Sequence, residues 1–261
     1  MSPSLPIPLD VRLMRLTSNL LLLGFVLGAL GVGAGWIANH PVFAIRGLTV
    51  LGDISHTSAL TLRAQVGPHL SGTFITVDLH AVRRAFEAVP WVRRAVVQRE
   101  FPNRLRVVLQ EHQAVAYWGE EGESTLVNSY GEVFEANPGE IDQESLPRLD
   151  GPREQSAQVL ALYQRLQPLF ERQGQQLSQL VLTGRGNWQL ELGSGADIEL
   201  GSGSEDEVLA RAQRFLDTVP QVAAHHGRRL DALETADLRY AQGYALRLRG
   251  VSTVQPAAAQ K

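Results

Sequence analysis

The chain has 261 residues, of which 44% are hydrophobic and 20% are charged, and its formal net charge is −3. It contains no cysteine, which excludes a disulfide framework, a thiol nucleophile and a cysteine-ligated metal. A net charge this close to neutral argues against nucleic acid as the main partner, because phosphate binding needs a clustered basic surface.

The first element is an uncharged segment, residues 16–39, which Arg12 and Arg15 precede. A helix of some 23 residues is about 35 Å long, enough to cross a hydrocarbon layer of about 30 Å. The two arginines favour a cytoplasmic location for residues 1–15, so the rest of the chain should lie outside the cytoplasm. We therefore expect a single-pass type II anchor in a cell inner membrane.

A cleaved signal peptide is the alternative, with an apolar core at residues 20–30 and small residues near Ala34. Such a core usually spans 7–15 residues. Here the uncharged stretch continues through Trp36 and Ile37, and Trp36 lies where an interfacial aromatic residue would. A retained transmembrane helix is the better interpretation.

Residues 43–113 predict a small three-stranded sheet with two helices on one face. Thr57 or Ser58 can cap the first helix, Asp78 can cap the second, and Pro90 prevents its continuation. Five segments show strand or helix periodicity in the order β-α-α-β-β, and they are residues 43–52, 58–66, 79–88, 92–100 and 105–111.

Residues 114–250 predict a second, mixed α/β domain with an antiparallel sheet. Pro168 should kink the helix predicted over residues 154–172 or end it early. Ser204 and Glu207 form a capping box that opens a helix to about Thr218. The expected strands are residues 125–127, 132–134, 177–182, 188–192, 197–200, 237–240 and, after a turn at 241–243, 244–249. Residues 251–261 lack periodicity and should be disordered.

The final strand, residues 244–249, alternates most regularly of all. If the chain adds its strands in order, this strand lies at a sheet edge. An edge strand exposes unpaired N–H and C=O groups, onto which a partner can add a strand of its own. The alternative is that the strand is central or protected from solvent.

The sequence predicts no catalytic, metal, cofactor or small-molecule site. Its seven histidines are scattered and match no ligand spacing such as H-E-x-x-H. His225 and His226 could hold a metal, but a solvated connection is the ordinary explanation. Gly201-Ser-Gly203 resembles a phosphate cradle, yet the acidic residues 205–207 that follow would repel an anion.

Two further patterns have a functional and a simpler interpretation. Arginines gather in the first module, as a solvated face or as a contact for anionic headgroups or an acidic partner. In the anchor, Gly24-x-x-x-Gly28 and Gly31-x-x-x-Gly35 have the spacing that lets membrane helices pair, although glycine is common in such helices. The arginines are Arg83, Arg84, Arg93, Arg94, Arg99, Arg104 and Arg106.

The first module resembles a POTRA, or polypeptide-transport-associated, domain. The residues that carry this resemblance are Phe43, Ile45, Leu48, Val50, Gly52, Gly72, Val77, Pro90, Trp91, Val92, Ala95, Val97, Pro102, Leu105, Val107 and Glu111. With the anchor, residues 126–134, Pro147-Arg-Leu149 before Gly151-Pro152, and Asp237-Leu-Arg-Tyr240 with Gly243, nearly the whole chain is similar to the FtsQ/DivIB family of bacterial division proteins. Ala114 departs from the family, which usually has proline there.

This resemblance implies a non-enzymatic scaffold at the division septum that binds FtsB, itself paired with FtsL, at the C-terminal edge. Tyr244 replaces a small family residue, so local contacts should differ. The alternative is a POTRA-bearing factor for polypeptide transport or outer-membrane assembly, but the chain is too short to supply a barrel. The contacts carried over by position are Arg239, Tyr240, Gln242, Gly243, Tyr244, Leu246 and Leu248.

Overall fold

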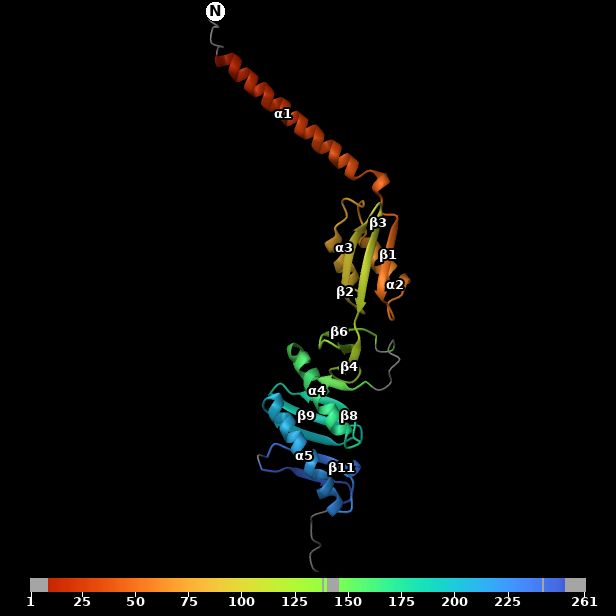
Figure 1. Ribbon diagram of the computed structural model, residues 1–261, viewed down its shortest axis with the longest axis vertical. Coiled ribbons are helices and arrows are strands. Elements are labelled where there is room, and N and C mark those ends of the chain that lie inside the picture. The colour runs from red at the N-terminus through yellow and green to blue at the C-terminus, as the bar shows by residue number, and fades with distance from the viewer. Residues whose placement is uncertain (1–8, 138, 140–145, 241, 252–261) are drawn as a thin grey trace, which may run out of the picture. The chain divides into compact units, whose positions relative to one another are not determined.

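The computed structural model describes residues 9–137, 139, 146–240 and 242–251. The chain divides into two compact units, Met1–Glu111 and His112–Lys261, which are described separately. Figure 1 shows the α+β architecture, with one N-terminal helix and a sheet in each unit. The predicted disordered tail lies outside the described residues except for Val251, as do most of the predicted cytoplasmic segment and Ala241 in the predicted turn.

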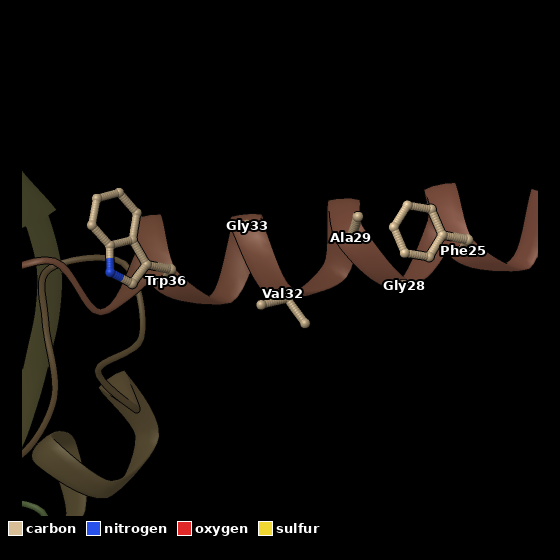
Figure 2. Close-up of a pocket in the computed structure, with 6 residues that line it drawn as sticks. All are labelled: Phe25, Gly28, Ala29, Val32, Gly33 and Trp36. Carbon is tan, nitrogen blue, oxygen red and sulfur yellow. The ribbon is translucent and has the colours of Figure 1, made fainter.

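Helix α1, Leu9–Ala38, contains the apolar stretch Leu13–Ala38, which is long enough to cross a membrane. Its apolar side chains are exposed along the helix, as a lipid-facing helix requires. In Figure 2, Phe25 and Trp36 border a shallow groove with Gly28, Ala29, Val32 and Gly33 between them.

The rest of the first unit confirms the predicted β-α-α-β-β order. Its sheet order is β1-β3-β2, with β1 parallel and β2 antiparallel to the central strand. Leu105, Val107 and Leu109 of the central strand are buried with both helices, whereas the alternate residues are exposed, so the helices cover one face. The elements are β1 (Gly47–Asp53), α2 (Ala59–Val66), α3 (Leu79–Glu87), β2 (Val92–Glu100) and β3 (Arg104–Glu111).

Local side chains begin both helices where the sequence predicted. Ser58 Oγ accepts Thr61 N–H at 3.1 Å, and Asp78 Oδ1 accepts His80 N–H at 2.8 Å and Ala81 N–H at 3.2 Å. The hydrogen bonds from Ala81 and His80 lower the pKa of Asp78, because they stabilise the carboxylate. Ser58, rather than Thr57, is therefore the first cap.

Two charged side chains bind the loops of this unit to its sheet. The Glu111 carboxylate accepts the N–H groups of Ser55, His56 and Thr57 at 2.8–3.0 Å. Burial alone would raise the pKa of Glu111, but these hydrogen bonds lower it overall. At the other end of the sheet, Arg99 donates to the carbonyls of Phe74, Ile75 and Val77.

The described residues of the second unit form one nine-stranded sheet in the order β12-β11-β10-β9-β8-β7-β4-β5-β6. It is mixed rather than wholly antiparallel, because the pairs β10–β11, β7–β8 and β4–β7 are parallel. The strands are β4 (Ala114–Trp118), β5 (Thr125–Asn128), β6 (Val133–Glu135), β7 (Arg148–Asp150), β8 (Leu177–Leu182), β9 (Asn187–Leu192), β10 (Asp197–Ser202), β11 (Leu233–Asp237) and β12 (Ala245–Leu248).

Two helices, α4 (Ser156–Glu171) and α5 (Glu205–His225), pack their apolar sides against this sheet. The predicted capping box at α5 is confirmed, since Ser204 and Glu207 exchange side chain-to-backbone hydrogen bonds. A kink or an early end was predicted at Pro168; the early end is wrong, because α4 continues to Glu171, and the kink stays a prediction. Helix α5 likewise runs beyond Thr218 through Pro220. Burial of the flanking apolar side chains offsets the proline's lost hydrogen bond.

The C-terminal strands also differ in their bounds from the prediction. Strand β11 occupies Leu233–Asp237, so residues 238–240 are an irregular connection rather than a strand. The final strand was predicted over residues 244–249 and is observed over Ala245–Leu248. The strands β4 and β7 were not predicted, because each is short and depends on distant parts of the chain for its pairing.

Candidate partner-binding edge

The last strand of the chain is also the terminal strand of the sheet. Strand β12 pairs antiparallel with β11, and no other strand in the described part of the chain borders it. Strand β6, with three residues, lies at the opposite end of the same sheet. The predicted edge position of the final strand is therefore what the structure has.

The ladder between β12 and β11 fixes which backbone groups of β12 face outward. Arg249 N–H, just beyond the strand, donates to Ala232 O at 2.7 Å, so it points toward the β11 side. Backbone groups alternate direction along a strand, and hence the N–H and C=O groups of Arg247 also face β11. Leu246 therefore directs its N–H and C=O groups to the open side, and Leu248 directs its N–H there, whereas the Leu248 carbonyl accepts Val251 N–H at 3.1 Å.

The side chains of the same residues point into the core of the unit. Leu248 is buried, and Leu246 and Tyr244 are partly buried against the hydrophobic core. Leu246 pairs with the buried Ala236, and their side chains share one face. A charged residue at Leu246 would thus disturb the fold as well as any partner contact.

Tyr244 connects the start of β12 to α5. Its ring contacts the buried Phe215 edge-on, with the ring centroids 5.0 Å apart, and its hydroxyl lies 2.9 Å from Thr218 Oγ1. The aromatic contact and the hydrogen bond together hold the strand entry in place. Tyr244, which we predicted as a partner contact, therefore also has a structural role.

Arg239 is held by its own chain. Its guanidinium forms two hydrogen bonds to Asp237, from Nε to Oδ1 at 2.9 Å and from Nη2 to Oδ2 at 2.6 Å. The hydrogen bonds from the Arg239 side chain lower the pKa of Asp237. The arginine stem lies against Gly201, which has φ +80° and where an added Cβ would come within 2.9 Å of Arg239 Cγ. Arg239 thus stabilises the end of β11.

Tyr240, Gln242 and Gly243 lie together beside the entry to β12. The Tyr240 side chain is exposed, as are Gln242 and Gly243. With Tyr244 they line one side of a groove of about 240 Å³. The structure therefore brings together four of the seven predicted contacts, and places Leu246 and Leu248 further along the strand.

The other side of this groove comes from α5, which sequence reasoning did not include. The lining residues there are Arg211, Arg214, Phe215 and Thr218, together with Leu238 after β11. Arg211 Nη2 donates to Ser202 O at 2.5 Å. The i, i+3, i+4, i+7 spacing from Arg211 to Thr218 could have indicated a shared helix face. The two guanidinium groups make the groove suitable for an acidic side chain.

The described residues contain no group of three histidine, cysteine or acidic side chains that could hold a metal ion. The rings of His225 and His226 stack with their centroids 5.4 Å apart at the end of α5. The cradle-like segment at residues 201–203 leads into the capping box of Ser204 and Glu207, which accounts for its geometry. The candidate site is therefore a sheet edge with an adjoining groove.

An apolar membrane-length helix, a β-α-α-β-β module and a mixed sheet with an open terminal strand define a membrane-anchored, POTRA-bearing protein. Residues 43–112 match the family description "POTRA domain, FtsQ-type", and residues 116–239 match "Cell division protein FtsQ/DivIB, C-terminal". The chain belongs to the FtsQ/DivIB family of cell division proteins.

Individual relatives extend this similarity over nearly the whole chain. The chain is 42% identical to a cell division protein FtsQ of Thiomonas arsenitoxydans, over 94% of this chain and 90% of that protein. It is 37% identical to that of Burkholderia pseudomallei, over 93% and 94%. These relatives support a scaffold role in cell division, with other division proteins as partners.

Proposed function

We propose that this protein is a non-enzymatic scaffold of the divisome that binds FtsB, paired with FtsL, by adding a partner strand to β12. It would be a single-pass type II protein of the inner membrane, with its bulk in the periplasm at the division septum, where it links early and late division proteins. Family membership favours this role over polypeptide transport or outer-membrane assembly.

The open side of β12 is the observation that carries the proposal. Leu246 offers an outward backbone donor and acceptor, Leu248 offers an outward donor, and the inward side chains anchor the strand to the core. A partner strand would gain main-chain hydrogen bonds there without rearranging the sheet. Arg239, held by Asp237, would contribute by keeping the β11 end in shape.

The groove between α5 and residues 238–244 would add side-chain specificity. Gly243 has no atom within 4 Å of an added Cβ, so a partner backbone could approach it closely. Arg211 and Arg214 would attract an acidic partner residue beside the added strand. Tyr240 and Gln242 would border that residue.

A proline at Leu246 tests strand addition, because it removes an outward N–H and leaves the inward ladder to β11 intact. Leu246→Pro should weaken binding of an FtsB–FtsL complex by about 10-fold or more relative to Leu246→Ala, since an edge hydrogen bond is lost and the ring obstructs the partner backbone. Binding is measured with the full chain in detergent, by titration against the purified complex.

Both variants lose the same leucine packing, so alanine controls for the core. Arg247→Pro is a second control: its N–H faces β11, and it should destabilise the strand itself. Equal affinities for Leu246→Pro and Leu246→Ala would contradict strand addition at this edge.

A further inference from the structure

The end of the first module nearest to α1 is tied closely to that helix. Phe43 follows the last helical residue, Ala38, by five residues, which can span at most about 18 Å. Thr73 Oγ1 donates to Ala38 O at 2.6 Å, and Phe74 N–H donates to Phe43 O at 2.7 Å. Residues 73–75 therefore stay within a short reach of the membrane surface if α1 spans the membrane.

Three large apolar side chains are exposed at this end. Val42 is 61% exposed, Ile75 46% and Phe101 85%. Figure 1 shows β1 beginning, β2 ending and β3 beginning at one end of the module. The turn that contains Phe101 is bonded to the segment before β1, because Arg46 N–H donates to Asn103 O at 3.0 Å. Arg99, two residues before Phe101, donates to the Ile75 carbonyl. We name Val42, Ile75 and Phe101 the apolar tip.

The charge around the apolar tip is positive. Arg46 and Arg104 are exposed beside the turn. Glu100 is the acidic residue next to Phe101, and its Oε1 is bound by Arg106 Nη2 at 2.5 Å, so it does not neutralise the other two arginines. Apolar and aromatic side chains with flanking arginines are the combination that favours the headgroup region of an anionic membrane.

We propose that the apolar tip inserts into the headgroup region of the membrane that α1 crosses, while Arg46 and Arg104 bind phosphate groups of anionic phospholipids. We choose the lipid surface as the binding partner because the short chain segment between α1 and Phe43 keeps the apolar tip close to the membrane that α1 spans. The contact would hold the first module against the bilayer. This inference depends on α1 being retained as a membrane span, and it is independent of strand addition at β12.

The chain has no cysteine, so Phe101→Cys can carry one environment-sensitive fluorophore such as NBD. The full chain is reconstituted into vesicles of phosphatidylcholine with or without phosphatidylglycerol. Leu60→Cys is the matched control, because Leu60 is 80% exposed in the same module. It lies in the first turn of α2, which follows the loop that Glu111 binds at the opposite end of β3.

A label at position 101 should show blue-shifted emission and lose most of it to a nitroxide placed on lipid headgroups, whereas a label at position 60 should show neither. Replacing Arg46 and Arg104 with glutamate should reduce the quenching in vesicles that contain phosphatidylglycerol. Equal quenching at positions 101 and 60 would overturn the proposal. If quenching at position 101 is the same with and without phosphatidylglycerol, and the same with and without Arg46 and Arg104, the proposed phosphate contact is wrong. No division partner is present, so the result is separate from the test of β12.

Discussion

The two folded units complete their sheets in different ways. In the first, charged side chains at both ends of a three-stranded sheet bind loop backbone groups: Glu111 accepts three N–H groups and Arg99 donates to three carbonyls. In the second, the terminal strand β12 is held from one side by β11 and by apolar contacts of Tyr244, Leu246 and Leu248.

In the first unit, polar contacts hold the loops at both ends of the sheet. In the second unit, the edge strand β12 remains open to a partner strand. Polar closure depends on ionisation, so the first unit should respond to pH through Glu111. Apolar anchoring leaves the outward N–H and C=O of Leu246 and the outward N–H of Leu248 unpaired within the described residues, and the position of β12 should depend on core packing. Three further changes test this contrast.

The largest effect is expected from Phe215→Ala, which removes a buried ring that contacts Tyr244. The second unit should lose about 3–5 kcal/mol of its free energy of unfolding. Hydrogen exchange of the full chain in detergent should show faster exchange at residues 245–248 than in the rest of the sheet. Val222→Ala, a partly exposed position on the same helix, is the control. Unchanged exchange at β12 would show that Tyr244 does not anchor it.

A smaller, pH-dependent loss is expected from Glu111→Gln, about 1–2 kcal/mol in the first unit at neutral pH. The pKa of Glu111 is lowered in the folded state, so its contribution is present above its ordinary value of 4.5 and disappears as the pH falls through the folded value. Wild type and variant should therefore converge in unfolding experiments as the pH falls from 4.5 through the lowered pKa of folded Glu111.

The control for this pH effect is Glu121→Gln, an exposed carboxyl in the second unit. Its unfolding curve should remain parallel to that of the wild type. A difference in the free energy of unfolding between wild type and Glu111→Gln that stays constant from pH 7 to pH 3 would argue that Glu111 acts through its shape rather than its charge.

The smallest effect is expected from Arg99→Ala, about 1 kcal/mol, because the guanidinium is solvent-accessible although it donates three hydrogen bonds. Amide exchange should rise at residues 74–77 and stay unchanged in β12. Arg94→Ala, exposed on the same strand, is the matched control and should change neither region. Similar exchange at residues 74–77 in the two variants would show that the hydrogen bonds of Arg99 do not hold this loop.

Sequence reasoning located the candidate edge but not all of its surroundings. The final strand was recognisable from its alternation and its place at the end of the chain. Arg211 and Arg214 were missed because the capping box that predicts their helix does not show that the helix lies beside the final strand. The pairing of Arg239 with Asp237 could not be anticipated either, because it depends on the irregular backbone after β11.

The sequence by itself determined what depends on neighbours along the chain: the membrane-length apolar helix, the caps at Ser58 and Asp78, the capping box at Ser204, and the order β-α-α-β-β. Tertiary structure alone decided the short parallel strands β4 and β7, and the continuation of α4 through Pro168. The reason is physical. Caps and periodicity act within a few residues, whereas parallel pairing and the burial that offsets a proline come from segments far apart in the chain.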